Sequence, residues 1–246
     1  MWHVLLFDIR FLAYVPGSDI WQARLISRGV YKRSLSRLQA PVVLRDVPAP
    51  FGQQHLDHLS QVSRLMRLRG IPWPRTLLLG KGTFRLGSPL ELHSLTLRGE
   101  GETLLQGEIR VKGKCTIASC SIRGKNKHLS RPHSRQLLKV GVRLLPSAHL
   151  TLQEVSISHV QGYGIFVGPD AELEAEGVVV RDSLLCNAYL DRRARVHFLR
   201  SYLHGVCWGI ECMCGVHLHL DKTRVDHSGV YNVKVRETTT VRYTDI

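Results

Sequence analysis

A set of histidine and aspartate residues recurs at matching places in the C-terminal half of the chain. His159, Asp182, His204 and His227 follow one another at intervals of 23, 22 and 23 residues. Imidazole and carboxylate groups placed side by side can bind a metal ion or transfer protons in acid–base catalysis. The same residue types also satisfy backbone groups in turns. The spacing therefore predicts a polar column, which is either a metal-binding or acid–base site or a set of turn residues that satisfy backbone groups.

Cysteines and carboxylates do not form a recognisable catalytic or metal-binding pattern. Cys207, Cys212 and Cys214 could offer thiolates to zinc, but they lack paired C-x-x-C spacing, and Cys212 falls at an apolar position of the repeat described below. We therefore expect no catalytic residues, no metal and no cofactor.

The six cysteines follow no signal peptide, so we expect free thiols in an intracellular, cytoplasmic or nuclear protein. No apolar run approaches the roughly 20 residues that cross a bilayer, so we expect no membrane partner.

The net positive charge belongs to the part of the chain that precedes Gly141. The net charge of +14 divides into +7 for residues 1–76, +8 for 77–140 and −1 for 141–246. Such a basic region can contact phosphates or an acidic protein, although no aromatic residues lie between the cations for base stacking. The candidate basic patch consists of Arg110, Lys112, Lys114, Arg123, Lys125, Lys127, Arg131, Arg135 and Lys139.

These residues are positioned by an internal repeat. Gly141-Val-Arg-Leu, Gly164-Ile-Phe-Val, Asn187-Ala-Tyr-Leu, Gly209-Ile-Glu-Cys and Asn232-Val-Lys-Val begin 23, 23, 22 and 23 residues apart. In each, apolar and variable residues alternate, and two further short alternating segments follow. We expect the leading Gly or Asn to occupy a corner with positive φ. Three short strands per repeat are typical of one coil of a parallel β-helix, which buries its apolar side only when coils stack.

The predicted fold is a mainly β, right-handed parallel β-helix solenoid of about seven coils over residues 76–246. The repeat length is similar to that of pectate-lyase-like solenoids. Less regular coils precede the repeat, and we expect Leu97 and Ile122 to be one coil apart. Ile122 and Ile157 are separated by 35 residues, so one coil carries an inserted basic loop at about 124–136.

The N-terminal residues have a helical pattern that resembles an F-box. Apolar residues share a helical face over residues 4–13, Pro16-Gly17 ends that helix, and Ser18 or Asp19 can cap the next. The segments Leu6–Ile9, Tyr14–Ile20 and Ala23–Tyr31 match the places of the F-box pattern. We expect an F-box-like module over 1–45 and a connector with a short helix over 46–75.

The resemblance implies a partner and a role. F-box-only proteins with β-helix repeats act as substrate receptors of cullin-RING ubiquitin ligases, in which the F-box docks a Skp-type adaptor. By position, the docking residues would be Leu5, Leu6, Ile9, Leu12, Val15, Pro16 and Ile20. The same residues could instead pack the helices together or cap the first open edge of the solenoid.

The leading prediction is a non-catalytic recognition scaffold, acting as substrate adaptor of an SCF-type ubiquitin ligase for an unknown, acidic protein substrate. A structural or RNA-contacting subunit of a large assembly is the first alternative, because nucleic acid could bind the basic patch. A degenerate carbohydrate-active β-helix is the second.

Overall fold

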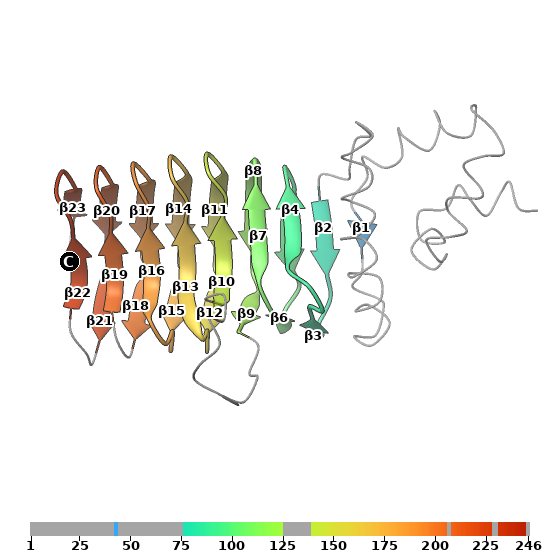
Figure 1. Ribbon diagram of the computed structural model, residues 1–246. Helices are drawn as coiled ribbons and strands as arrows, with labels where there is room; N and C mark the ends of the chain where they lie inside the picture. Colours follow the sequence, from blue (N-terminus) through green and yellow to red (C-terminus); the bar gives the residue numbers. More distant parts are fainter. Residues whose placement is uncertain (1–41, 44–75, 125–138, 206–207, 228–230, 245–246) are drawn as a thin grey trace, which may run out of the picture.

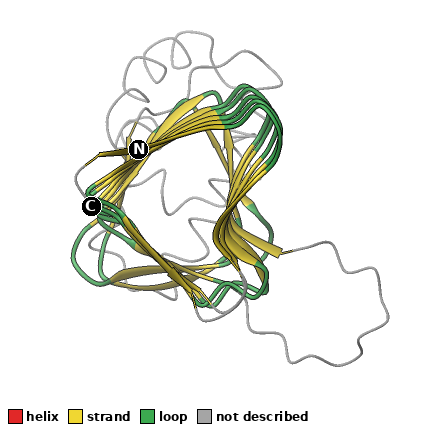
Figure 2. Ribbon diagram, turned by 90° about the vertical axis from the view of Figure 1, so that its left-hand side faces the viewer, coloured by secondary structure: helices red, strands yellow, loops and turns green. Residues whose placement is uncertain are grey.

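The computed structural model describes residues 42–43, 76–124, 139–205, 208–227 and 231–244. Within these ranges the chain is a parallel β-solenoid and contains no helix (Figure 1). Successive strands turn from one face to the next, so that three sheets enclose the interior when the solenoid is viewed along its axis (Figure 2). The stacked coils predicted from the sequence repeat are therefore confirmed.

From β2 onward each coil contributes one strand to each sheet, and neighbouring strands within a sheet are parallel. Sheet A contains β1 (Val42–Val43), β2 (Thr76–Leu79), β5 (Thr96–Gly99), β8 (Lys114–Ala118), β11 (His149–Gln153), β14 (Glu172–Glu176), β17 (Arg195–Leu199), β20 (His217–Asp221) and β23 (Thr240–Thr244). Sheet B contains β3 (Gly82–Arg85), β6 (Thr103–Gln106), β9 (Ser121–Arg123), β12 (Ser156–Ser158), β15 (Val179–Arg181), β18 (Tyr202–Gly205) and β21 (Arg224–His227). Sheet C contains β4 (Leu90–His93), β7 (Ile109–Lys112), β10 (Lys139–Leu144), β13 (Gly162–Val167), β16 (Cys186–Leu190), β19 (Trp208–Cys212) and β22 (Tyr231–Val235).

The core consists of columns of apolar side chains that point inward from equivalent strand positions. Ile165, Ala188 and Ile210 occupy one register column of sheet C, and each is fully buried. Cys212 is buried in the neighbouring column, as expected for a small apolar residue. Val235 and Tyr243 continue the columns of the buried residues Cys212 and Leu220, but both are 53% exposed. They lie on β22 and β23, which have a neighbouring strand on one side only among the described residues.

The early coils are shorter than the sequence suggested. Leu97 pairs with Ile117, and both lie in sheet A, whereas Ile122 lies in sheet B. The expectation that Leu97 and Ile122 are one coil apart is therefore wrong. Ile122 does pair with Ile157, so the coil that joins these two residues carries the insertion, between β9 and β10.

The glycines that begin the repeat motif lie inside strands of sheet C rather than at corners, and close packing rather than positive φ requires them. Gly141 and Gly164 are not among the residues with positive φ, which corrects our expectation. A Cβ atom at Gly164 would lie 2.7 Å from the carbonyl oxygen of Asn187 on the next coil. Left-handed conformations occur instead at the corners between sheets C and A, at Ser147, Asp170 and Arg193.

Buried hydroxyl groups join the coils at the corner between sheets A and B. Ser201 Oγ accepts a hydrogen bond from the Val178 amide at 3.1 Å, and Thr223 Oγ1 accepts one from the Ser201 amide at 3.2 Å. Thr223 Oγ1 also donates to a backbone carbonyl oxygen, that of Phe198 at 3.0 Å. These contacts satisfy backbone groups that the corners would otherwise bury without partners.

Candidate functional site

Two members of the predicted polar column are neighbours at one corner. His159 Nε2 and Asp182 Oδ2 are 3.8 Å apart, and both side chains are partly exposed. Both residues have left-handed backbone conformations, with φ of 54° and 57°. Aspartate and histidine are among the residues that tolerate this conformation best, so the turn itself accounts for their presence in this column.

The other two members do not extend the column as a continuous row. His204 pairs with Arg181 and Asp226, one position away from the column, and Gly205 takes the place next to Asp182. The backbone of His227 pairs with Gly205. Gly205, which has no side chain, therefore separates His159 and Asp182 from His227 in the column. Among the described residues, no group of three or more His, Cys, Asp or Glu side chains could hold a metal ion.

The predicted basic patch is distributed over three faces. Arg110, Lys112 and Lys139 lie on sheet C, Lys114 on sheet A and Arg123 on sheet B. The remaining members, Lys125, Lys127, Arg131 and Arg135, lie outside the described residues, as do the predicted docking residues Leu5, Leu6, Ile9, Leu12, Val15, Pro16 and Ile20.

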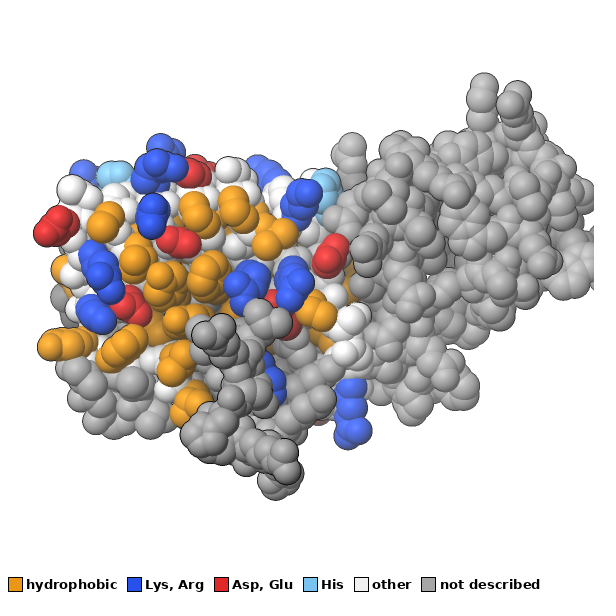
Figure 3. Space-filling model, viewed as in Figure 1, with side chains coloured by type: hydrophobic (Ala, Val, Ile, Leu, Met, Phe, Trp, Pro, Cys, Tyr) orange, Lys and Arg blue, Asp and Glu red, His pale blue; other side chains and the backbone are white. Residues whose placement is uncertain are grey.

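Sheet C carries a group of outward-facing aromatic side chains that the sequence analysis did not identify. We call Tyr163 and Phe166 on β13, Tyr189 on β16 and Trp208 on β19 the aromatic ridge. All four are partly exposed. Figure 3 shows hydrophobic side chains gathered across this face, with Lys and Arg side chains on both sides.

Three rings of the ridge, those of Tyr163, Phe166 and Tyr189, pack against one another across two neighbouring strands. Phe166 and Tyr189, which pair in register, are stacked with their centroids 5.2 Å apart and an interplanar angle of 12°. Tyr163 contacts both rings, with centroid distances of 5.9 and 5.0 Å. Burial raises the pKa of the Tyr163 and Tyr189 hydroxyls, so both hydroxyls remain protonated at neutral pH. The ridge is therefore an ordered apolar strip with hydroxyl groups.

Cations cover the two ends of the ridge. The guanidinium carbon of Arg143 lies 4.8 Å from the centroid of Phe166, and Lys234 Nζ lies 4.3 Å from that of Trp208. Each cation also contacts a carboxylate. Arg143 Nε is 3.1 Å from Glu108 Oε1, and Lys234 Nζ is 3.1 Å from the nearly buried Glu211. These cation–π and ionic contacts restrict the side chains before any partner binds.

The sequence did contain a signal for the ridge. The variable third residue of the repeat motif is Arg143, Phe166, Tyr189, Glu211 and Lys234 in successive coils. The pairing register places these five residues in one outward column. Comparison of the variable positions, rather than of the apolar ones, would have predicted that Phe166 and Tyr189 are neighbours on the outer surface.

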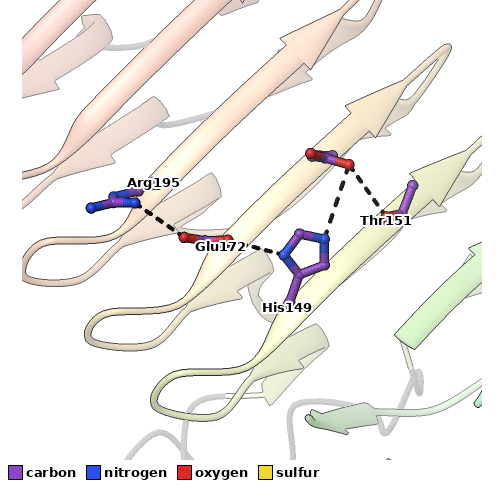
Figure 4. A network of polar contacts seen from close by, with 5 residues as sticks. His149, Thr151, Glu172 and Arg195 are labelled. Carbon is purple, nitrogen blue, oxygen red and sulfur yellow. Dashed lines mark hydrogen bonds and ion pairs between the residues drawn. The ribbon is translucent and has the colours of Figure 1, made fainter. Parts of the chain in front are cut away.

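Sheet A carries a separate polar network on its outer surface (Figure 4). His149 Nδ1 lies 3.0 Å from Glu172 Oε2, and Arg195 Nη1 lies 3.4 Å from the other oxygen of Glu172. At the adjoining corner Arg193 makes two hydrogen bonds to Asp170, at 2.6 and 2.7 Å, and the pKa of Asp170 is lowered by them. Each pair joins neighbouring coils, so the network supports the stacking register.

Comparison with known proteins does not identify the chain: no family model, curated protein or solved structure matches it. The described residues include no helix with the length and apolar character needed to cross a membrane.

Proposed function

We propose that the protein is a non-catalytic recognition scaffold that binds a protein partner through the aromatic ridge. The observation that carries this proposal is the cluster of contacting rings formed by Tyr163, Phe166 and Tyr189 on the outer surface of a regular sheet. Tyrosine, tryptophan and arginine are the residues that most often dominate binding energy at protein interfaces. Here they occur together on one face.

The packing of the ridge favours binding over catalysis. The rings contact each other and the terminal cations, so little side-chain freedom remains to be lost when a partner binds. The outer edges of the rings and the tyrosine hydroxyls combine apolar area with hydrogen-bonding groups, as at interface hot spots.

The resemblance of the N-terminal residues to an F-box supports a more specific role. In this proposal the module over residues 1–45 docks a Skp-type adaptor, and a right-handed solenoid presents the substrate to an SCF-type ubiquitin ligase. The substrate receptor and the docking module are then separate parts of one chain, and each can be tested alone by substitution.

The recognition role is tested by selecting peptides from a displayed random library against the full chain. We expect enriched peptides to lose at least tenfold in affinity for the Tyr189→Ser variant. Tyr202→Ser is the matched control, because Tyr202 is also a partly exposed, outward-facing tyrosine, but it lies on sheet B. Equal affinity for both variants and the unchanged protein would reject the ridge as the binding surface.

The adaptor role is tested by co-purification of the full chain with a purified Skp-type adaptor. We expect the unchanged protein to bind, and the double variant Ile9→Asp, Ile20→Asp to lose binding while its solenoid still gives a β-sheet circular dichroism spectrum. Absence of binding by the unchanged protein would refute the ubiquitin ligase proposal without affecting the recognition test.

A further inference from the structure

One end of the aromatic ridge continues into a group of cations on the same sheet. We call Arg110, Lys112, Lys139 and Arg143, on β7 and β10, the cationic end. Arg110 and Arg143 pair in register, so their side chains stand on adjacent strands. Phe166 of the ridge is the next residue of this column, in contact with Arg143. Cationic and aromatic groups therefore form one continuous surface.

Among the residues that the structure describes, carboxylates compensate only part of this charge. Arg110 Nε and Arg143 Nε share a single oxygen of Glu108, at 2.9 and 3.1 Å. Lys139 Nζ donates a hydrogen bond to the neutral amide oxygen of Gln161 at 2.6 Å, which leaves the ammonium charge in place. Lys112 is exposed.

The two ends of the ridge consequently differ in charge. Within the described part of this surface, Glu108 and Glu91, which pairs with Arg110 on the next strand, place two carboxylates against the four cations, a net charge of +2. At the other end Lys234 is paired with the carboxylate of Glu211, and these two charges cancel. A partner with one acidic end and one apolar end would match this asymmetry.

We propose that the ridge binds an acidic segment of a protein, with its carboxylates over the cationic end and its apolar side chains on the ridge. This inference rests on the proposed function and specifies the chemistry of the partner. The segment crosses the strands along the solenoid axis, because the cationic and aromatic residues are arranged in that direction.

The strand spacing determines the pattern that the segment needs. Arg110 on β7 and Tyr189 on β16 lie in one register column three strand steps apart, which corresponds to about 14 Å at about 4.8 Å per step. An extended peptide covers that distance in about four residues, at about 3.3 Å per residue. The acidic residue and the apolar residue of the partner should therefore be three to five positions apart.

The geometry of the rings favours a peptide over single-stranded nucleic acid. Nucleic acid binding uses exposed ring faces on which bases stack. Here Phe166 is covered by Tyr189 on one side and by Arg143 on the other. The four ridge residues are nevertheless partly exposed, and their apolar rings suit aliphatic and aromatic side chains of a protein.

The experiment uses the peptides enriched on the full chain in the display selection. We expect Asp or Glu to be over-represented three to five positions from an aromatic or aliphatic residue. In fluorescence anisotropy the most enriched peptide should bind at least tenfold more tightly than the same peptide with every Asp and Glu replaced by Lys, and its affinity should fall as salt rises.

Two charge-reversal variants separate this surface from general charge effects. The pair Arg110→Glu, Lys112→Glu should weaken the acidic peptide at least tenfold and strengthen the lysine version. The control Lys114→Glu, close to Lys112 in the chain but on sheet A, should change neither by more than about twofold. Thermal unfolding of each variant establishes that it is folded.

Three results would overturn the inference. The first is that the peptides that depend on the ridge show no acidic bias, or bind the Arg110→Glu, Lys112→Glu protein with unchanged affinity. This result would refute the acidic partner but would leave the proposed recognition scaffold intact. Ridge-dependent binding of a short oligouridylate more tightly than the best peptide would assign the surface to nucleic acid. Absence of any ridge-dependent peptide would refute the proposed function itself, and the inference with it.

Discussion

Replacement of Gly164 by alanine tests whether the solenoid is held at its observed coil spacing by the absence of a side chain. The added Cβ would lie 2.6 Å from a methyl group of Val180 and 2.7 Å from the Asn187 carbonyl oxygen. The valine side chain can rotate, but the carbonyl belongs to the backbone of the next coil. The alanine therefore has to separate two hydrogen-bonded strands.

The size of the effect follows from that displacement. Ordinary van der Waals contact begins at 3.4 Å, so the Cβ and the oxygen must move apart by about 0.7 Å. Neighbouring contacts between these coils, such as the 3.0 Å hydrogen bond from the Leu185 amide to the Gly162 carbonyl, would be stretched. Overpacking costs about 1–3 kcal/mol, and the lower chain entropy of alanine offsets less than about 1 kcal/mol. We expect a net loss of about 2 kcal/mol.

Thermal unfolding of the full chain, followed by circular dichroism, measures this loss. For a domain of this size about 2 kcal/mol corresponds to a fall in Tm of about 4–8 °C. The control is Gly177→Ala, where the nearest atom to the new Cβ is 3.8 Å away and only the left-handed φ of 61° opposes the side chain. This control should cost about 1 kcal/mol. A fall in Tm for Gly164→Ala no larger than for Gly177→Ala would refute the close-packing argument.

Three further predictions concern thiols and buried hydroxyls. Iodoacetamide at pH 8 should modify the exposed Cys214 rapidly and Cys186 only on unfolding, because burial raises the pKa of Cys186 to about 12. Mass spectrometry measures the labelling, and equal labelling of the two cysteines in the folded protein would contradict this prediction. Burial also raises the pKa of Cys120 from 9.0 to about 12, so above pH 9 the unfolded chain loses a proton that the folded chain keeps. Cys120 alone should then lower the free energy of unfolding by up to about 1.4 kcal/mol per pH unit between pH 9 and 12. Cys120→Ala should reduce the slope measured in urea titrations by up to that amount, and an unchanged slope would count against the prediction. Thr223→Val removes the acceptor of the buried Ser201 amide, so the free energy of unfolding measured in urea should fall by about 1–3 kcal/mol. A loss below about 0.5 kcal/mol would show that the amide finds another partner.

The regular coils could be predicted because their interior imposes a repeated apolar pattern. Ile165, Ala188 and Ile210 recur at nearly constant intervals since each must stack on the one before. The early coils were assigned incorrectly for the opposite reason. Their corners are shorter, so Leu97 already repeats at Ile117, and a search for a longer period misses the match.

The candidate site was less accessible to sequence reasoning. Catalytic and metal-binding patterns draw attention to His, Asp and Cys, but His159 and Asp182 lie at a left-handed turn and Cys212 lies in the core. The basic patch looked continuous in sequence, yet Lys112 and Lys114 lie on different sheets. A short corner between β7 and β8 is enough to place neighbouring cations on different faces.

The coiled architecture could be inferred from the amino-acid sequence alone, because burial of an apolar column restricts residue types at every repeat. The position of the inserted segment could be inferred as well, since the insertion lengthens one interval. The meeting of particular outward residues, in contrast, depends on how the coils stack. Parallel stacking brings Arg143, Phe166 and Tyr189 into contact from three successive coils, and no local pattern requires outward side chains to be aromatic or charged. The aromatic ridge is therefore a property of the register between coils, which forms only when the chain is folded.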